Sequence, residues 1–521
     1  MIKAAATSKP GPAFAGLVIA ACAAAGLFIT VTGDALPMLL AGAVATFFVS
    51  IVCVTLFGMQ GALLFLPLGA AFFLMQRFDE GLAIDLGGFS FRGFYTVIGL
   101  LFAVFALVSI PIRTDTPTKL IDRENLKGAF FICFTGFLAA ALLGFALNQM
   151  MDGELPDRKP LAELVAMYAI FLPMLYLPLA LRADPGPTRT ELLLHVCVGL
   201  GGLSGLILSA FGILPGQVLG MLGWSGAIGG TADLVRGRLP LGHPNHVAAV
   251  LNMLLPPAVV YGLLGRNALL RAFNLGCAGL MLCGVLFALS RGALLNLGIA
   301  LAATLLYVVF ARENRRWYTL PLVLLASLAV AGAAFSLFAS FDFSRYWSKR
   351  YYEEKSVERR MDSMQTAVNV FLDYPVLGVT PDAVYPRVDL RPGWEPRFAD
   401  SISPVIYYKG HPSAETPHNL YLIVPAEFGL VGAVCFFGLI GAMAYTLLRV
   451  RGRPGIEMHD RRMLTAYLIG LGAFMLSGMF EAVLMAGMRL NVIFWVFYGL
   501  VFVFAFHAVR RVDAVAADGR G

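Results

Sequence analysis

The sequence has little charge and no cysteine framework. Only 14% of its 521 residues are charged and 59% are hydrophobic, whereas a soluble domain carries about a quarter charged residues. All seven Cys residues lie within apolar runs, and none lies in the polar stretch 341–418. This distribution excludes a disulfide scaffold and a Cys-based metal site. The basic residues do not gather on one polar domain, which argues against nucleic-acid binding.

Apolar runs of about 20 residues recur along most of the chain, and runs of this length are typical of transmembrane helices. We therefore predict an all-α fold, a polytopic transmembrane helical bundle of about 12–14 spans. The candidate spans lie at 12–31, 36–57, 60–76, 93–112, 128–148, 162–181, 191–213, 245–265, 272–289, 292–311, 318–340, 419–448, 463–484 and 491–509. The polar stretch 341–418 interrupts this pattern, and a loop of such length is usually functional.

Loops rich in Lys and Arg fall on one side of the membrane if the predicted spans alternate. These loops are 113–127, 182–190, 266–271, 312–316, 449–462 and 510–511. Such loops usually face the cytoplasm, so we expect both termini there and 341–418 outside. The expected units are 1–340, a transmembrane bundle; 341–418, one large outer loop with short helices; and 419–521, the C-terminal spans with a cytoplasmic tail.

The first polar stretch on the predicted outer side begins at Arg238 and reads RLPLGHPNHVAAV. Pro244 and Asn245 suit the start of a helix, and Asn is a favoured N-cap. Asn245 and His246 would then lie at the outer mouth of a span. A capped helix entry and a substrate-facing role explain these residues about equally well, because the polar groups are numerous for one cap.

The second stretch, LSRGALLNLG, separates two apolar runs with almost no loop. Its Arg291 lies on the outer side, against the trend of the other basic residues, and follows Ser290. The Arg291 side chain could simply reach lipid headgroups. A functional role is favoured, because a charge at the membrane edge usually has a partner and a guanidinium suits phosphate oxygens.

The stretch 341–418 contains a short amphipathic helix pattern that ends before Pro375. The predicted apolar stripe consists of Met361, Met364, Val368 and Phe371. Arg359 and Arg360 fall in the first turn of this helix, where cations are disfavoured. They indicate either a nearby anion or, as the simpler interpretation, a solvated surface.

His418 stands where the next predicted span begins, and Asn419 can cap that helix. A helix N-terminus favours neutral imidazole, which is the form that a general base needs. Taken alone, a His at the end of a span is more often an interfacial polar group than a catalyst.

Four motifs occur in order along the chain. They are His243-Pro244-Asn245, Ser290-Arg291-Gly292, Arg360 with Asp373-Tyr374-Pro375 and Leu377-Gly378, and His418-Asn419 with Tyr421-Leu422 and Glu427-Phe428-Gly429. Over about 240–432, this series resembles the superfamily of O-antigen ligases and Wzy-type O-antigen polymerases. The resemblance implies a helical bundle in the bacterial inner membrane whose large loop, 341–418, is periplasmic.

The resemblance also implies that Arg291, Arg360 and His418 are catalytic. The reaction it implies moves a glycan from undecaprenyl pyrophosphate to an acceptor hydroxyl, with no metal and no cofactor, in the biosynthesis of lipopolysaccharide or exopolysaccharide. Residues expected to bind substrate are Arg238, Asn245, His246, Ser290, Arg291, Arg359, Arg360 and Asn419.

The chemistry of these residue types agrees with that reaction. Charge builds on the departing diphosphate, and two Arg forks can stabilise it, while His418 can take the proton of the attacking hydroxyl. Expected partners are the lipid-linked glycan donor, a glycan, lipid A core or other hydroxyl acceptor, membrane lipid, and other polysaccharide-assembly proteins, but no nucleic acid.

Three alternatives remain beside a ligase. A polymerase, which uses a second lipid-linked repeat unit as acceptor, explains the sequence about equally well. A metal-dependent polyprenyl-linked glycosyltransferase would use Asp79 and Glu80, but these acids follow about the third span rather than the first. A lipid-linked glycan flippase or transporter would keep charges deep in its spans and show internal repeats, and the sequence shows neither clearly.

Overall fold

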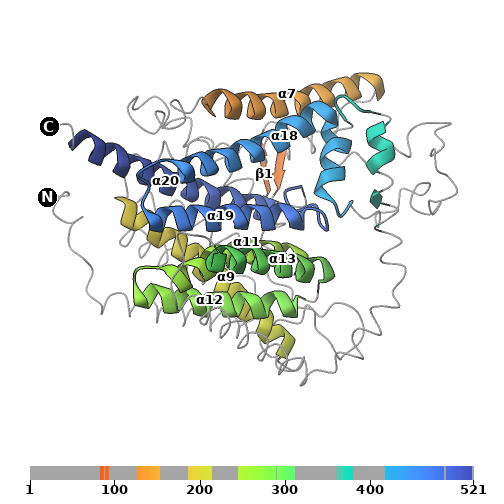
Figure 1. Ribbon diagram of the computed structural model, residues 1–521. Helices are drawn as coiled ribbons and strands as arrows, with labels where there is room; N and C mark the ends of the chain where they lie inside the picture. The colour runs from red at the N-terminus through yellow and green to blue at the C-terminus, as the bar shows by residue number, and fades with distance from the viewer. Residues whose placement is uncertain are drawn as a thin grey trace.

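The computed structural model describes about half of the chain. The described residues are 83–86, 89–92, 126–152, 186–213, 244–288, 290–310, 360, 363–364, 367–372, 374–378, 417–485 and 488–518. Within these ranges the protein is a bundle of long helices (Figure 1). The helices are α7 (Leu126–Asp152), α9 (Gly186–Ile213), α11 (Pro244–Leu264), α12 (Ala268–Phe287), α13 (Arg291–Phe310), α18 (Leu420–Gly452), α19 (Met458–Ser477) and α20 (Met488–Asp518).

Each of these helices coincides with a predicted span, and the other predicted spans lie outside the described residues. Within the described residues, six helices contain a stretch long and apolar enough to cross a membrane. The prediction of a polytopic helical bundle is therefore confirmed, and the chain is a multi-pass membrane protein. One boundary differs from the prediction: α19 ends at Ser477 rather than near 484, because the chain turns at Gly478 and continues as a series of turns to Met485.

The described part also contains one short hairpin. Strand β1 (Ala83–Leu86) pairs antiparallel with β2 (Phe89–Arg92), with Asp85 opposite Ser90. The sequence between the strands is Gly87-Gly88, a two-residue connection of the kind that tight hairpin turns require. Part of the acidic loop 77–92 is thus a hairpin.

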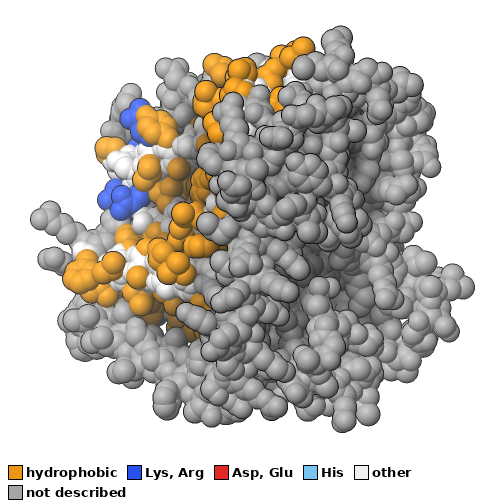
Figure 2. Space-filling view, turned by 90° about the vertical axis from the view of Figure 1, so that its right-hand side faces the viewer, with side chains coloured by type: hydrophobic (Ala, Val, Ile, Leu, Met, Phe, Trp, Pro, Cys, Tyr) orange, Lys and Arg blue, Asp and Glu red, His pale blue; other side chains and the backbone are white. Residues whose placement is uncertain are grey.

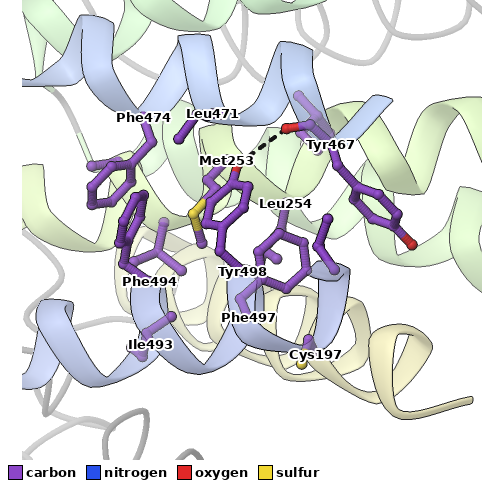
Figure 3. Close-up of a cluster of buried hydrophobic side chains, with 14 of the residues drawn as sticks. Cys197, Met253, Leu254, Tyr467, Leu471, Phe474, Ile493, Phe494, Phe497 and Tyr498 are labelled. Atoms are coloured by element: carbon purple, nitrogen blue, oxygen red, sulfur yellow. Dashed lines mark hydrogen bonds between the residues drawn. The ribbon is translucent and has the colours of Figure 1, made fainter. Parts of the chain in front are cut away.

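Helix α11 is the centre of the bundle. Of its span Asn245–Leu264, 94% is buried, and its neighbours are α9, α12, α13 and α19. Figure 3 shows how Met253 and Leu254 of α11 meet aromatic side chains of α19 and α20. Phe474 and Phe494 stack there with ring centroids 4.7 Å apart. Such aromatic packing fixes the three helices relative to one another.

Small residues bring α9 and α12 close together. A Cβ placed on Gly205 of α9 would lie 2.2 Å from the carbonyl oxygen of Leu280, and one on Gly284 of α12 would lie 2.5 Å from Cα of Gly205. Close backbone approach at Gly is a common way for membrane helices to associate without a hydrophobic driving force.

Helix α18 is broken. Gly429 has φ 65° and ψ −172°, which interrupts the helix between Leu420 and Gly452. Figure 1 shows the N-terminal part of α18 turned across the long axis of the remainder. This break lies eleven residues after His418 in the sequence, so it determines how the start of α18 approaches the other helices.

The two ends of the bundle differ in chemistry. At one, the basic end, Arg266 pairs with Glu457 (2.5 Å) and Arg453 with Asp513 (2.6 Å). These ion pairs join the α11–α12 turn, the α18–α19 turn and the end of α20. The described Arg-rich loops therefore meet at one end, as the alternation of spans predicts; the assignment of that end to the cytoplasm remains a prediction.

Candidate functional site

The opposite end, here called the site end, is where the start of α18 meets the turn after α19. Asn419 caps α18, because its Oδ1 accepts a hydrogen bond from the amide of Tyr421 (2.9 Å). Leu420 N donates to Gly478 O (2.7 Å), and Asn419 Nδ2 donates to Met479 O (3.3 Å). The residue that precedes this cap, His418, is thereby held against the turn 478–485.

Glu481 lies in that turn, and several polar side chains of the site end contact its carboxylate. It is 4% exposed. Its Oε1 is 2.5 Å from Nδ1 of His418, and its Oε2 accepts a hydrogen bond from Nδ2 of Asn245 (2.8 Å). Nε2 of His246 is 3.8 Å from Oε1. We call Asn245, His246, His418 and Glu481 the His–Glu cluster.

The His–Glu cluster is a buried anion between two imidazoles. Burial by itself raises the pKa of Glu481, but the hydrogen bonds and charges of His246 and His418 outweigh it, and the net pKa lies well below the usual range. Glu481 is therefore ionised at neutral pH. An ionised carboxylate accepts the Nδ1–H of His418 and so selects the tautomer in which Nε2 can accept a proton. This is the arrangement of a general base and its orienting group.

The start of α13 lies beside the same turn. Ser290 is buried and its Oγ accepts a hydrogen bond from the amide of Ala293 (3.3 Å), which makes it an N-cap. A Cβ added to Gly292 would lie 2.7 Å from Cβ of Phe480, the neighbour of Glu481. The first turn of α13, with Arg291 at its first position, is therefore packed against the turn that carries Glu481.

Buried amide side chains hold α13 in this position. Asn252 of α11 donates through Nδ2 to the carbonyl of Ala293 (3.1 Å). Nδ2 of Asn296 donates to the carbonyl of Ala473 (2.8 Å) and lies 2.5 Å from Oγ of Ser477, both on α19. Since buried polar groups are costly to leave unpaired, these bonds fix the register of α13 against α11 and α19.

The predicted amphipathic helix is present where its residues are described: 360, 363–364 and 367–372 are helical, and we call these residues the island helix. It packs on the first part of α18: Ala367 and Val370 form a buried cluster with Ala426, and Tyr374 and Leu422 pack against this cluster. Arg360 is half-buried at the start of the helix.

The buried face of the island helix differs from the predicted apolar stripe. Met364, Val368 and Phe371 are only half-buried, whereas Ala367 and Val370 are buried; Met361 lies outside the described residues. The side chains that face Ala426 of α18 are the smaller ones, Ala367 and Val370. A stripe of larger side chains at the same face would hold the two backbones further apart.

Comparison with known protein families identifies part of this arrangement. Residues 276–437 match the family described as O-antigen ligase. Over this segment, the chain is similar to the O-antigen ligase family. A comparison with curated proteins found no match. The matched segment contains the start of α13, the island helix, His418 and the broken part of α18. The predicted resemblance is therefore confirmed over three of the four motifs, and the first motif, at 243–245, precedes the match.

The His–Glu cluster extends beyond the matched segment on both sides. Asn245 and His246 precede the segment, and Glu481 follows it. Among the predicted substrate-binding residues, Asn245, His246 and Asn419 thus lie with His418 at the site end. Ser290 lies at the adjacent helix start. Arg238, Arg359 and the side chain of Arg291 lie outside the described residues.

Sequence reasoning missed Glu481. The available signal is a single acid in the otherwise apolar stretch LSGMFEAVLMAG, since an ionisable residue at such a position is a functional candidate by default. Within the described ranges, no group of three His, Cys, Asp or Glu side chains is placed to hold a metal ion. Asp79 and Glu80 lie outside those ranges, and metal independence remains a prediction for this protein.

Proposed function

We propose that this protein is a glycosyltransferase of the bacterial inner membrane that moves a glycan from undecaprenyl pyrophosphate to an acceptor hydroxyl on the periplasmic face. The observation that carries the proposal is the pairing of His418 with the buried carboxylate of Glu481 at the mouth of the bundle, within 2.5 Å. A His so oriented is a general base, and the similarity to the O-antigen ligase family supplies the substrate class.

In the proposed reaction, the acceptor oxygen attacks the anomeric carbon of the donor sugar. The bond from that carbon to the diphosphate oxygen breaks, and the diphosphate leaves with the bonding electrons. Nε2 of His418 takes the proton of the attacking hydroxyl. Glu481 then faces an imidazolium rather than an imidazole, and its negative charge stabilises the protonated form.

Two Arg residues are proposed to hold the departing diphosphate, because planar guanidinium groups bind phosphate oxygens through paired hydrogen bonds. For Arg291, the support is the packing of Gly292 against Phe480, which brings its helix start to the turn that carries Glu481. A charge-stabilising group at this position would act where negative charge develops in the transition state.

For Arg360, the support comes from the alignment of two helices. Ala367 packs beside Ala426, and further along the chain Val376 contacts Gly429, so the island helix and the start of α18 run in the same direction. At a rise of 1.5 Å per residue, Arg360 lies about 10 Å before Ala367, and His418 about 12 Å before Ala426. Arg360 and His418 are therefore expected at the same level.

The apolar flanks of the bundle suit the lipid part of the donor. Leu295, Ile299 and Leu306 of α13 are exposed, as expected for side chains in contact with acyl or prenyl chains. In the view of Figure 2, hydrophobic side chains gather along one edge of the described surface, together with Lys and Arg. An apolar tail can lie along such a flank while its diphosphate stays at the membrane surface.

The test uses purified protein in detergent with an undecaprenyl-pyrophosphate-linked glycan. His418→Ala is expected to reduce transfer about 10²–10⁴-fold. The matched control is His459→Ala, which removes an imidazole from another His–Glu pair, with Glu191 (3.0 Å), at the basic end. Loss of thermal stability is expected from the control, but not loss of turnover.

Donor consumption in detergent separates transfer from transport, since no compartment is present. Parallel reactions with lipid A core and with a second lipid-linked repeat as acceptor distinguish a ligase from a polymerase. Equal activity of the wild type and His418→Ala would refute the proposed base. Absence of donor consumption with every acceptor would refute the proposed function.

A further inference from the structure

The break in α18 is a crossing point with the chain segment that follows the island helix. This segment, 374–378, forms a turn in which Gly378 N donates to Tyr374 O (3.1 Å). Gly378 has φ +69° and Gly429 has φ +65°. Backbone conformations with positive φ are strained for residues other than Gly, and that of Gly429, with ψ −172°, falls in a region that is essentially restricted to Gly.

Backbone hydrogen bonds join the two segments at the break. Leu430 N donates to the carbonyl of Pro375 (2.8 Å), and Val431 N donates to the carbonyl of Val376 (3.3 Å). The first amides of a helix have no acceptor within the helix. The turn 374–378 therefore caps the second part of α18, in the place that a capping side chain would otherwise take.

Each Gly fits against the backbone of the opposite segment. A Cβ on Gly378 would lie 2.4 Å from the carbonyl carbon of Glu427, and a Cβ on Gly429 would lie 2.2 Å from the carbonyl carbon of Val376. Gly144 of α7 approaches the same turn, since its Cβ would lie 2.7 Å from the carbonyl oxygen of Leu377. The obstructing atoms are backbone, so they cannot move aside as a flexible side chain would.

We propose that Gly378 and Gly429, supported by Gly144, form a glycine clasp that positions the island helix, and Arg360 with it, against the start of α18. The inference rests on the proposed function, in which Arg360 and His418 act on one substrate. Because His418 precedes the part of α18 that the island helix contacts, one clasp sets the relative position of both groups. The three Gly residues are positioning residues.

If the clasp positions Arg360, a single methyl group added at Gly429 or Gly378 should lower kcat. Gly429→Ala or Gly378→Ala must separate the two backbones by more than 1 Å to reach ordinary contact distances, and the hydrogen bonds to Leu430 and Val431 would lengthen with them. Misplacement of a reacting group by about 1 Å typically reduces turnover by about 10²-fold. We expect a reduction in kcat of this order.

A structural readout independent of activity is the disulfide between Ala367→Cys and Ala426→Cys, introduced after replacement of the seven native Cys residues. These two positions share one buried cluster. Oxidation should link them in the otherwise unchanged protein and fail to do so in Gly429→Ala. The matched control is Gly441→Ala in the same helix, where an added Cβ meets nothing within 4 Å; it should keep both the link and the activity.

If Gly378→Ala and Gly429→Ala do not fold, Gly144→Ala replaces them as the test variant. Its added methyl group meets one carbonyl oxygen of the clasp from the side of α7, so the obstruction is smaller. A link formed as efficiently in folded Gly429→Ala or Gly144→Ala as in the control would overturn the clasp, whatever the activity. Loss of the link with unchanged kcat would overturn the positioning role. If the wild type transfers no glycan, the proposed function fails, while the linking experiment still tests the clasp.

Discussion

Replacement of Glu481 tests the His–Glu cluster most directly. Glu481→Ala leaves Nδ2 of Asn245 and Nδ1 of His418 without the carboxylate that accepts from them. A buried donor that loses its acceptor costs about 1–3 kcal/mol. Asn245 is buried and His418 is only partly buried, so unfolding should become easier by about 2–4 kcal/mol. Glu481→Gln keeps the shape and one acceptor oxygen, and a loss of about 1–2 kcal/mol is expected.

The effect of Glu481→Gln on catalysis should exceed its effect on stability. The amide oxygen can accept from only one of the two donors. Where the amide NH₂ faces His418, the imidazole must accept at Nδ1, carry its proton on Nε2, and lose its function as a base. We expect kcat to fall about 10²–10³-fold, with little change in the KM for the donor, because Glu481 does not contact it in the proposed reaction.

Transfer rates at saturating donor, together with thermal unfolding in the same detergent, measure the two effects separately. Glu457→Gln is the control: its partner Arg266 is 65% exposed, and an exposed ion pair contributes less than about 1 kcal/mol. A Glu481→Gln protein that is destabilised but retains kcat within about 3-fold would show that Glu481 supports only the fold. An unchanged unfolding temperature would refute the buried hydrogen bonds themselves.

The pH dependence of stability gives a second test of Glu481. Its pKa in the folded protein lies below its ordinary value of 4.5. Because the folded-state pKa is the lower one, the contribution to stability is present in full above the ordinary pKa and is lost as pH falls through the folded-state pKa. The difference in unfolding temperature between wild type and Glu481→Gln should therefore still be present at about pH 5.5 and shrink only below about pH 4. A difference that disappeared between pH 7 and 6 would contradict the assignment.

The remaining predictions concern other parts of the chain. Arg291→Lys and Arg360→Lys should each reduce transfer severely, because an ammonium cannot form the paired hydrogen bonds of a guanidinium; transfer rates and donor binding measure this, and full activity would exclude a diphosphate contact. Transfer should persist in excess chelator, and restoration by magnesium or manganese after loss would favour a metal-dependent mechanism. Arg511→Ala, which leaves the 2% exposed Asp460 without its partner at 2.5 Å, should destabilise the protein by about 2–4 kcal/mol. Arg266→Ala should change the unfolding free energy by less than about 1 kcal/mol. Equal losses of stability in Arg511→Ala and Arg266→Ala would contradict the expectation that the buried ion pair contributes more than the exposed one.

Local sequence signals predicted the helices well. Run length and apolarity fix a membrane span, so the described helices fall where the hydropathy places them. Two helix starts were equally accessible, because their signals are local: Pro244 opens α11 and Asn419 caps α18. The N-cap role of Ser290 was not predicted. The common end of the Arg-rich loops followed from counting spans.

Features that depend on distant partners were not accessible in this way. Glu481 bonds residues 63 and 236 positions away, and no pattern in one sequence indicates such pairs. The buried face of the island helix was predicted wrongly, because side-chain volume at the contact with α18, rather than apolarity, decides which face turns inward. Gly429 could not be singled out among 55 Gly residues, since its φ angle depends on the crossing segment.

In the proposed reaction, the break at Gly429 also decides how far His418 would stand from the lipid. The part of α18 after the break, Leu430–Gly452, is about 34 Å long, enough to cross the hydrocarbon core of about 30 Å by itself. If the helix continued straight, His418 would stand about 16 Å beyond the hydrocarbon, out of reach of a diphosphate anchored by a short lipid linkage. Because the first part of α18 turns aside at Gly429 (Figure 1), it does not extend the axis of Leu430–Gly452, and we expect the imidazole to stay at the depth of the headgroups.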